Sequence, residues 1–134
     1  MPVLVDTNVL LDVATEDPAW FDWSVAQLGR AANRDGLAIN PIVYAELSVH
    51  HESLEALEMA LSGHPFARLA LPWDAAFVAG YAYRRYRRQG GAKRSPLPDF
   101  HIGAHAAVAG LTLLTRDAKR YRDYFPELTL ITPP

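Results

Sequence analysis

The sequence contains no cysteine among its 134 residues. This absence excludes a disulfide scaffold, thiolate-ligated zinc, iron–sulfur clusters and a cysteine nucleophile. Long hydrophobic runs are also missing, since the longest uncharged apolar stretch, residues 100–115, has 16 residues and includes two histidines and two glycines. Such a segment is too short and too polar to span a membrane, and Asp6 interrupts the place of a signal-peptide core. We therefore expect a cytoplasmic protein with no membrane segment.

Two enzyme motifs are absent as well. The sequence has no Gly-rich phosphate loop ending in Lys-Ser or Lys-Thr, and none of its five serines lies in a Gly-x-Ser-x-Gly turn. These absences argue against a phosphatase or phosphoryl transferase and against a serine hydrolase. Half of the residues are hydrophobic and 21% are charged, which is typical of a globular protein. Because there is no internal repeat or linker, we predict one domain over residues 1–134.

Short apolar segments alternate with amphipathic segments along the chain. This alternation is typical of an α/β protein in which helices cover both faces of a parallel sheet. We predict a central parallel sheet of four to five strands. The predicted strands are residues 3–5, 37–39, 67–71, 111–115 and 128–131, and the predicted helices begin near Asp17, Pro41, Leu54, Asp74, Pro98 and Ala118.

Four acidic residues are candidates for a functional site. Asp6 follows the first predicted strand and Asp117 follows the fourth, where parallel sheets bind their ligands. Glu46 lies on the apolar face of one predicted helix, and Asp99 begins another. Each acid also has a structural explanation: Asp6 and Asp117 as helix caps, Asp99 as a first-turn acid, and Glu46 with its carboxylate in water. Together, however, four anions in one cleft would repel one another unless a divalent cation lay among them.

The donor atoms of this acidic group indicate which cation it would bind. Carboxylate oxygens suit the hard ions Mg²⁺ and Mn²⁺. Such an ion orients a water molecule, lowers its pKa and stabilises charge developing on a phosphodiester. His101 and His105 share one helix face at a four-residue spacing, which fits a proton shuttle, metal ligands or a purely structural role.

A basic stretch precedes the third of these acids. Residues 75–97 contain no Asp or Glu, and the cations between them are Arg84, Arg85, Arg87, Arg88, Lys93 and Arg94. Arg84, Arg87 and Arg88 share a helix face. A solvated helix end is one explanation, and a surface that guides a phosphate backbone toward Asp99 is another.

Four ordered sequence blocks resemble the PIN-domain ribonucleases, and among them the VapC-like toxins of bacterial and archaeal toxin–antitoxin pairs. The first block is Val-Asp-Thr-Asn-Val-Leu at residues 5–10, and the second surrounds Glu46. The third is Leu-Pro-Asp-Phe-His-Ile-Gly-Ala-His-Ala at residues 97–106, and the fourth is Leu-Thr-Arg-Asp at residues 114–117. The ending Tyr-Phe-Pro at residues 124–126 extends the resemblance over nearly the whole chain.

The resemblance implies a PIN-like three-layer α/β/α sandwich and a metal-dependent endoribonuclease that acts as a toxin. Metal-activated water would cleave RNA phosphodiester bonds, a small antitoxin would cover the active-site groove, and the chain would form a homodimer. The residues that match the family's acidic catalytic and metal-binding group are Asp6, Glu46, Asp99 and Asp117, with Asn8 and Thr115 supporting them by hydrogen bonds. For RNA binding we predict Arg84, Arg87, Arg88, Lys93, Arg94 and Arg116.

Two other functions remain open at the level of sequence. One is a non-catalytic RNA-binding or protein-interaction module with the same fold, although RNA binding alone gains nothing from four buried anions. The other is a phosphoryl transferase with Asp6 as its nucleophile. That chemistry normally needs a second acid two residues further on, where this chain has Asn8.

Overall fold

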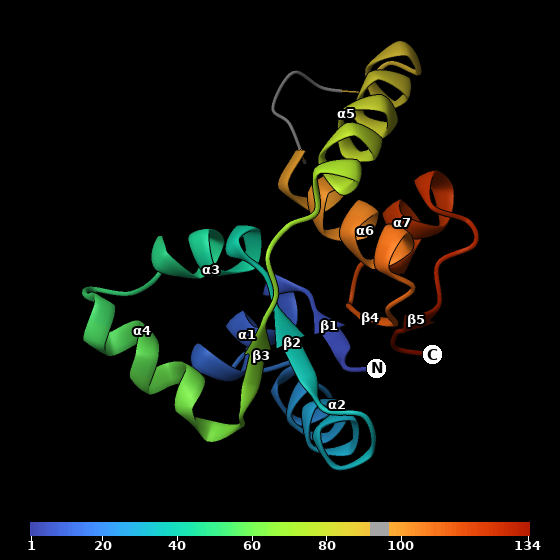
Figure 1. Cartoon of the computed structure of the whole chain (residues 1–134). Coiled ribbons are helices and arrows are strands. Elements are labelled where there is room, and N and C mark those ends of the chain that lie inside the picture. The colour runs from blue at the N-terminus through green and yellow to red at the C-terminus, as the bar shows by residue number, and fades with distance from the viewer. Residues whose placement is uncertain (92–96) are drawn as a thin grey trace.

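The computed structural model describes residues 1–91 and 97–134. Five strands form a single sheet in the order β3-β2-β1-β4-β5, and every neighbouring pair is parallel (Figure 1). This sheet confirms the predicted α/β class and strand number. The strands are β1 (Val3–Val5), β2 (Leu37–Ile39), β3 (Phe66–Arg68), β4 (Leu113–Leu114) and β5 (Leu130–Ile131).

Helices flank the sheet and complete the three-layer PIN-like architecture. In Figure 1, α3 and α4 lie on one side of the strands, α6 and α7 lie on the other, and α5 extends away from the sheet. The helices are α1 (Thr7–Ala14), α2 (Phe21–Arg34), α3 (Pro41–Ser48), α4 (Leu54–Ala60), α5 (Trp73–Arg88), α6 (Leu97–Ala109) and α7 (Ala118–Tyr124), with a short 3₁₀ turn, η1 (Leu61–Gly63). None of the helices in these described ranges has the length and hydropathy that a membrane crossing requires.

Local sequence signals explain where several helices begin. The Asn40 side chain accepts a hydrogen bond from the Val43 backbone N–H and caps α3, and Pro41 occupies the first turn. Ser53 caps α4 in the same way through the Ala56 N–H. Asp6 caps α1 by accepting from the Thr7 N–H, so its structural explanation holds alongside any functional one.

The structure corrects the predicted bounds of five elements. Helix α5 begins at Trp73 after Pro72, so Asp74 lies in its first turn and does not cap it. Helix α2 begins at Phe21, because the Asp17 carboxylate ties down the Ala19 and Trp20 N–H groups in a turn before the helix. The third strand covers Phe66–Arg68 instead of residues 67–71, and β4 and β5 each keep only two residues of the longer strands predicted.

The core explains why the inner strands are continuously apolar. Val3–Val5 and Leu113–Leu114 are buried on both faces, as expected for central strands of a parallel sheet. Helix α6 also packs closely on α7. A Cβ atom on Gly103 would lie 2.7 Å from the Phe125 ring and 2.9 Å from the Tyr121 ring. This glycine therefore lets α7 approach α6, which brings Tyr121 to the carboxyl edge of the sheet.

An aromatic cluster attaches α5 to α6. Phe100 contacts Tyr83, Tyr86 and Tyr124 with ring centroids 5.1–6.0 Å apart. Tyr83 and Tyr86 are thus packing residues, and of the α5 tyrosines only Tyr81 is exposed. This packing leaves the opposite face of α5 to solvent.

Candidate active site

Asp6 lies at the carboxyl edge of the sheet, where β1 and β4 run side by side. Its side chain is buried and accepts four hydrogen bonds. Oδ1 accepts from the Thr7 N–H at 2.8 Å, and Oδ2 accepts from Thr115 Oγ1 at 2.7 Å, Tyr121 OH at 2.9 Å and Asn8 Nδ2 at 3.4 Å. Strand pairing supplies this arrangement, because Leu114 lies beside Val5 and each is followed directly by a polar residue.

The environment of Asp6 makes its carboxylate unusually basic. Burial is the main cause and the negative charge of Asp99 adds to it, so that the pKa of Asp6 rises from 3.8 to about 7. The hydrogen bonds from Thr115, Tyr121 and the Thr7 N–H act in the opposite direction. Because burial removes water from this carboxylate, a bound cation would strongly stabilise its charged form.

This pKa predicts a pH dependence of stability. Because the folded protein holds the Asp6 proton more tightly than the unfolded chain does, stability should fall as the pH rises from about 4 to about 7. In Asp6→Asn this loss should be smaller, since the variant has no charge to bury at that position. Melting temperatures across this range, measured in EDTA for both proteins, test the expectation. Parallel curves for the two proteins would contradict it.

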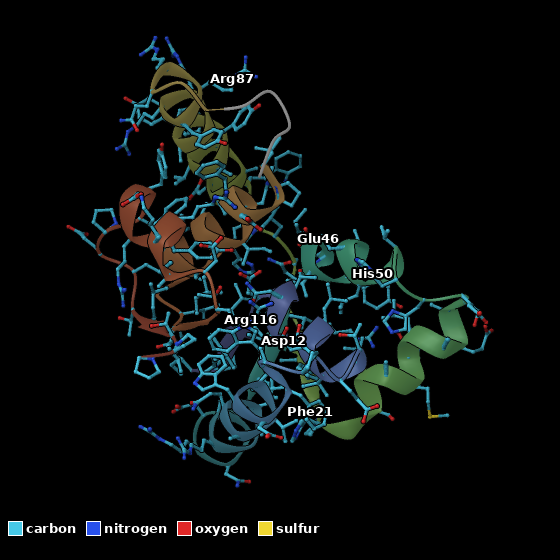
Figure 2. The ribbon with its side chains drawn as sticks, turned by 180° about the vertical axis from the view of Figure 1, so that it is seen from behind. Asp12, Phe21, Glu46, His50, Arg87 and Arg116 are labelled. Carbon is cyan, nitrogen blue, oxygen red and sulfur yellow. The ribbon has the colours of Figure 1, made fainter. Side chains whose placement is uncertain are left out.

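Glu46 approaches the same edge from α3. Its side chain is half-buried, and Oε1 accepts a hydrogen bond from Thr7 Oγ1 at 2.6 Å. Burial raises the pKa of Glu46, the Thr7 hydroxyl lowers it, and the charge of Asp99 raises it further. Thr7 thus contacts two of the candidate acids, Asp6 through its backbone and Glu46 through its side chain. Figure 2 shows Glu46 at one end of α3.

Asp99 and Asp117 share one arginine. Arg120 Nη1 lies 2.6 Å from Asp99 Oδ2 and 3.5 Å from Asp117 Oδ2. The pKa of Asp99 is nevertheless raised, because its burial outweighs the attraction of Arg120 and the charge of Asp117 adds to the effect. The Asp117 carboxylate forms no cap bond with α7, although the Asp117 N–H donates to Thr115 Oγ1 at 3.0 Å.

Asp99 links the four acids electrostatically. The charge of Asp99 acts on both Asp6 and Glu46, and that of Asp117 acts on Asp99. Their oxygens form the donor set that Mg²⁺ and Mn²⁺ prefer. As the side chains lie, no three acids or histidines in residues 1–91 and 97–134 are grouped closely enough to hold a metal ion. Arg120 holds the oxygens of two of the acids instead.

Asn8 and Thr115 connect the loops that carry these acids. Thr115 Oγ1 accepts from Asn8 Nδ2 at 3.3 Å, in addition to donating to Asp6. Asn8 Oδ1 accepts from the Arg116 backbone N–H at 3.3 Å. Both side chains therefore lie where a supporting role requires them.

Sequence reasoning missed Thr7, Arg120 and Tyr121. The signal for the last two was their spacing, since residues three and four positions after Asp117 on a helix face the same way as Asp117. Thr7 carried no comparable signal, because its hydroxyl reaches Glu46 across 39 residues of chain.

Arg116 lies in an ion pair with a fifth acid, Asp12. Its Nε and Nη2 atoms bind the Asp12 carboxylate at 2.6 Å and 2.9 Å (Figure 2). Its guanidinium also lies over the Trp20 ring. Asp12 is 3% exposed and also accepts from Ser24 Oγ at 2.8 Å. This structural role accounts for Arg116 and leaves its guanidinium little freedom to bind RNA.

Three of the other predicted RNA-binding residues lie near the C-terminal end of α5. Arg84, Arg87 and Arg88 are exposed, and Figure 2 places Arg87 at the far end of the helix. The other two predicted RNA-binding residues, Lys93 and Arg94, lie outside the described residues.

The two histidines of α6 do not join the acids. His105 is buried, and its Nδ1 lies 3.0 Å from Asn40 Nδ2. Because Asn40 Oδ1 already accepts from the Val43 N–H, the Asn40 amide donates and His105 Nδ1 accepts. Burial lowers the pKa of His105, so it is a neutral residue that fixes α6 to α3. His101 Nδ1 lies 2.9 Å from the Leu97 carbonyl oxygen of its own helix.

The chain belongs to the PIN domain family, since the family's sequence model matches residues 3–124. Its fold is similar to chains in solved toxin–antitoxin complexes. These include VapBC2 from Rickettsia felis bound to a promoter DNA fragment, at 22% identity and a TM-score of 0.73 with 98% of both chains covered. A toxin–antitoxin complex from Klebsiella pneumoniae matches at 25% identity and a TM-score of 0.70, also over 98% of both chains. VapBC-1 from nontypeable Haemophilus influenzae matches at 20% identity and a TM-score of 0.68, over 98% of both. A search of curated proteins gave no match.

Proposed function

We propose that this protein is a VapC-like toxin that cleaves RNA with the help of Mg²⁺ or Mn²⁺. The observation that carries the proposal is the buried Asp6, whose pKa is raised to about 7 at the sheet edge and which faces the charge of Asp99. Membership of the PIN family and similarity to VapBC complexes support the toxin class. The phosphoryl-transferase alternative loses support, since Tyr121 and Thr115 both occupy Asp6 Oδ2.

In this proposal Asp6, Glu46, Asp99 and Asp117 hold the metal ion. The ion supplies a lowered pKa for water and a positive charge beside the scissile phosphate. The protein orients the carboxylates that hold the ion. Thr115, Tyr121 and the Thr7 N–H fix the Asp6 carboxylate, and the Thr7 hydroxyl fixes Glu46.

A cleavage assay on total RNA tests the proposal, with purified protein, added Mn²⁺ and added EDTA. We expect discrete fragments in Mn²⁺ and none in EDTA. Mn²⁺ should also raise the melting temperature, and Asp99→Asn should reduce that rise. A folded protein that binds Mn²⁺ but cleaves no RNA would instead favour the non-catalytic module.

An apolar groove supports an antitoxin partner. The groove has a volume of about 400 Å³ and lies between α1, α2, α4 and β3. Its apolar lining fits one face of an amphipathic helix, a common way for proteins to bind a partner segment. We therefore assign it to a helix of the antitoxin. Its lining includes Leu10, Val13, Val25, Leu28, Leu61 and Phe66.

We further propose that α5 forms the interface of a homodimer. Trp73, Phe77 and Tyr81 follow one another at four-residue spacing and are 91%, 75% and 58% exposed, with the rings of Phe77 and Tyr81 stacked. Such an apolar stripe is typical of a protein interface. Phe77→Glu should therefore convert the dimer to a monomer, measured by light scattering after size-exclusion chromatography. Asp74→Ala, on the same helix, serves as the control, and an unchanged Phe77→Glu dimer would place the interface elsewhere.

The arginines of α5 are expected to bind RNA phosphates. Replacing Arg84, Arg87 and Arg88 together by Gln should weaken RNA binding and reduce the salt slope of log K by about 2, for three contacts to a single strand. The matched control replaces Arg30, Arg34 and Arg122, which are exposed on α2 and α7. Equal slopes for the two triple variants, measured by filter binding at several salt concentrations, would show that the α5 arginines do not contact RNA.

A further inference from the structure

Within residues 1–91 and 97–134, Arg120 is the only cation that forms an ion pair with any of the four candidate acids. It bridges the carboxylates of Asp99 and Asp117. It lies in the first half of α7, three residues after Asp117. Its Nη1 atom is 2.6 Å from Asp99 Oδ2, so Arg120 competes with a metal ion for the negative charge of that carboxylate. The guanidinium is always protonated in proteins, so Arg120 competes with a divalent cation for these acids at any pH.

The ion pair between Arg120 and Asp99 is exposed enough for another cation to replace Arg120. The Arg120 side chain is 32% exposed and that of Asp99 is 26% exposed. Ion pairs with this much solvent contact contribute little net free energy, because water screens them. A divalent ion carries a higher charge than Arg120. If it also binds the buried Asp6, it gains a carboxylate ligand that water solvates poorly.

A polar hollow lies next to Asp117, and Arg120 is part of its lining. It is lined by Tyr86, Asp117, Lys119, Arg120, Asp123 and Tyr124 and has a volume of about 290 Å³. The lining carries two cations and two acids, and Lys119 is paired with Asp123 at 3.0 Å. Once a divalent cation neutralises Asp117, Arg120 is the lining cation left to bind a phosphate. A planar guanidinium binds phosphate oxygens through two parallel hydrogen bonds, which a point charge does not provide.

We propose that Arg120 is a phosphate-binding residue that changes partners: a divalent cation takes Asp99 and Asp117 from it, and its guanidinium then binds an RNA phosphate at the hollow beside Asp117. This inference rests on the proposed nuclease function. It assigns to one residue both the neutralisation of the acids and the recognition of the substrate.

The first test is a calorimetric titration with Mn²⁺ in the absence of RNA. Arg120→Gln should bind Mn²⁺ about two- to fivefold more tightly than the wild-type protein, because the competing charge is gone. Arg120→Lys should lie between the two. Arg122→Gln, which removes an exposed cation from the same helix, should bind Mn²⁺ like the wild type. Circular dichroism confirms that each variant is folded.

The second test is the kinetics of RNA cleavage. Arg120→Gln should raise the KM for RNA at least about tenfold, the usual effect of losing a charged hydrogen bond, while Arg122→Gln should leave it unchanged. Mn²⁺ binding by Arg120→Gln that is unchanged or weaker overturns the exchange, and an unchanged KM overturns the phosphate contact. If the wild-type protein itself neither binds Mn²⁺ nor cleaves RNA, the proposed function fails, which is a separate outcome.

Discussion

Asp6→Asn is expected to reduce RNA cleavage at least a hundredfold, or roughly 3 kcal/mol in activation free energy. The variant removes the buried charge that we propose holds the metal ion. It also disturbs orientation, because the asparagine amide offers only one acceptor oxygen to Thr115, Tyr121 and the Thr7 N–H. The rate of cleavage of a defined RNA in Mn²⁺ measures the effect.

The fold of Asp6→Asn should survive, which separates this loss from unfolding. A neutral amide is cheaper to bury than a carboxylate, so the melting temperature at pH 7 should not fall with the activity. Asp22→Asn is the matched control, since Asp22 is exposed in the first turn of α2. Full activity of Asp6→Asn would remove Asp6 from the chemistry.

Arg116→Met should lower the free energy of unfolding by about 3 kcal/mol, although Arg116 is not one of the four candidate acids. The substitution leaves the Asp12 carboxylate buried at 3% exposure, with the Ser24 hydroxyl as its remaining hydrogen-bond donor. An uncompensated buried charge of this kind is among the most costly changes in a folded protein. Urea unfolding monitored by circular dichroism measures the free energy.

Two further variants identify the cause of that loss. Replacing Asp12 by Leu together with Arg116→Met should recover much of the stability, because no buried charge then remains. Arg122→Met, in which an exposed arginine is lost, should change stability by less than about 0.5 kcal/mol. A cost below about 1 kcal/mol for Arg116→Met would mean that water reaches Asp12.

The sheet was predictable because its inner strands are apolar on both faces. Residues 3–5 and 113–114 read as buried strands, and the polar residue after each one marked the edge where the candidate acids meet. The ends of strands and helices were less predictable, since they depend on turns such as the one that Asp17 forms before α2. Periodicity alone does not report such turns.

Charge partners could not be read from the sequence. Arg116 lies next to Asp117 in the chain, but its guanidinium binds Asp12, which is 104 residues away. Arg120, which lies outside the four sequence blocks that resemble the PIN family, binds Asp99 across 21 residues. Long side chains reach acids that only the tertiary fold brings near, so a cluster of arginines predicts the sign of a surface and not the partner of each residue.

The parallel pairing of β1 with β4 also has a consequence for synthesis of the protein. Asp6 is made before its hydrogen-bond donor Tyr121, which follows it 115 residues later. At 5–20 residues per second, roughly 6–23 s separate the two. Throughout that interval the nascent chain lacks a complete acidic site. The proposed metal-binding site therefore cannot form until the chain has been made as far as Tyr121 and has folded.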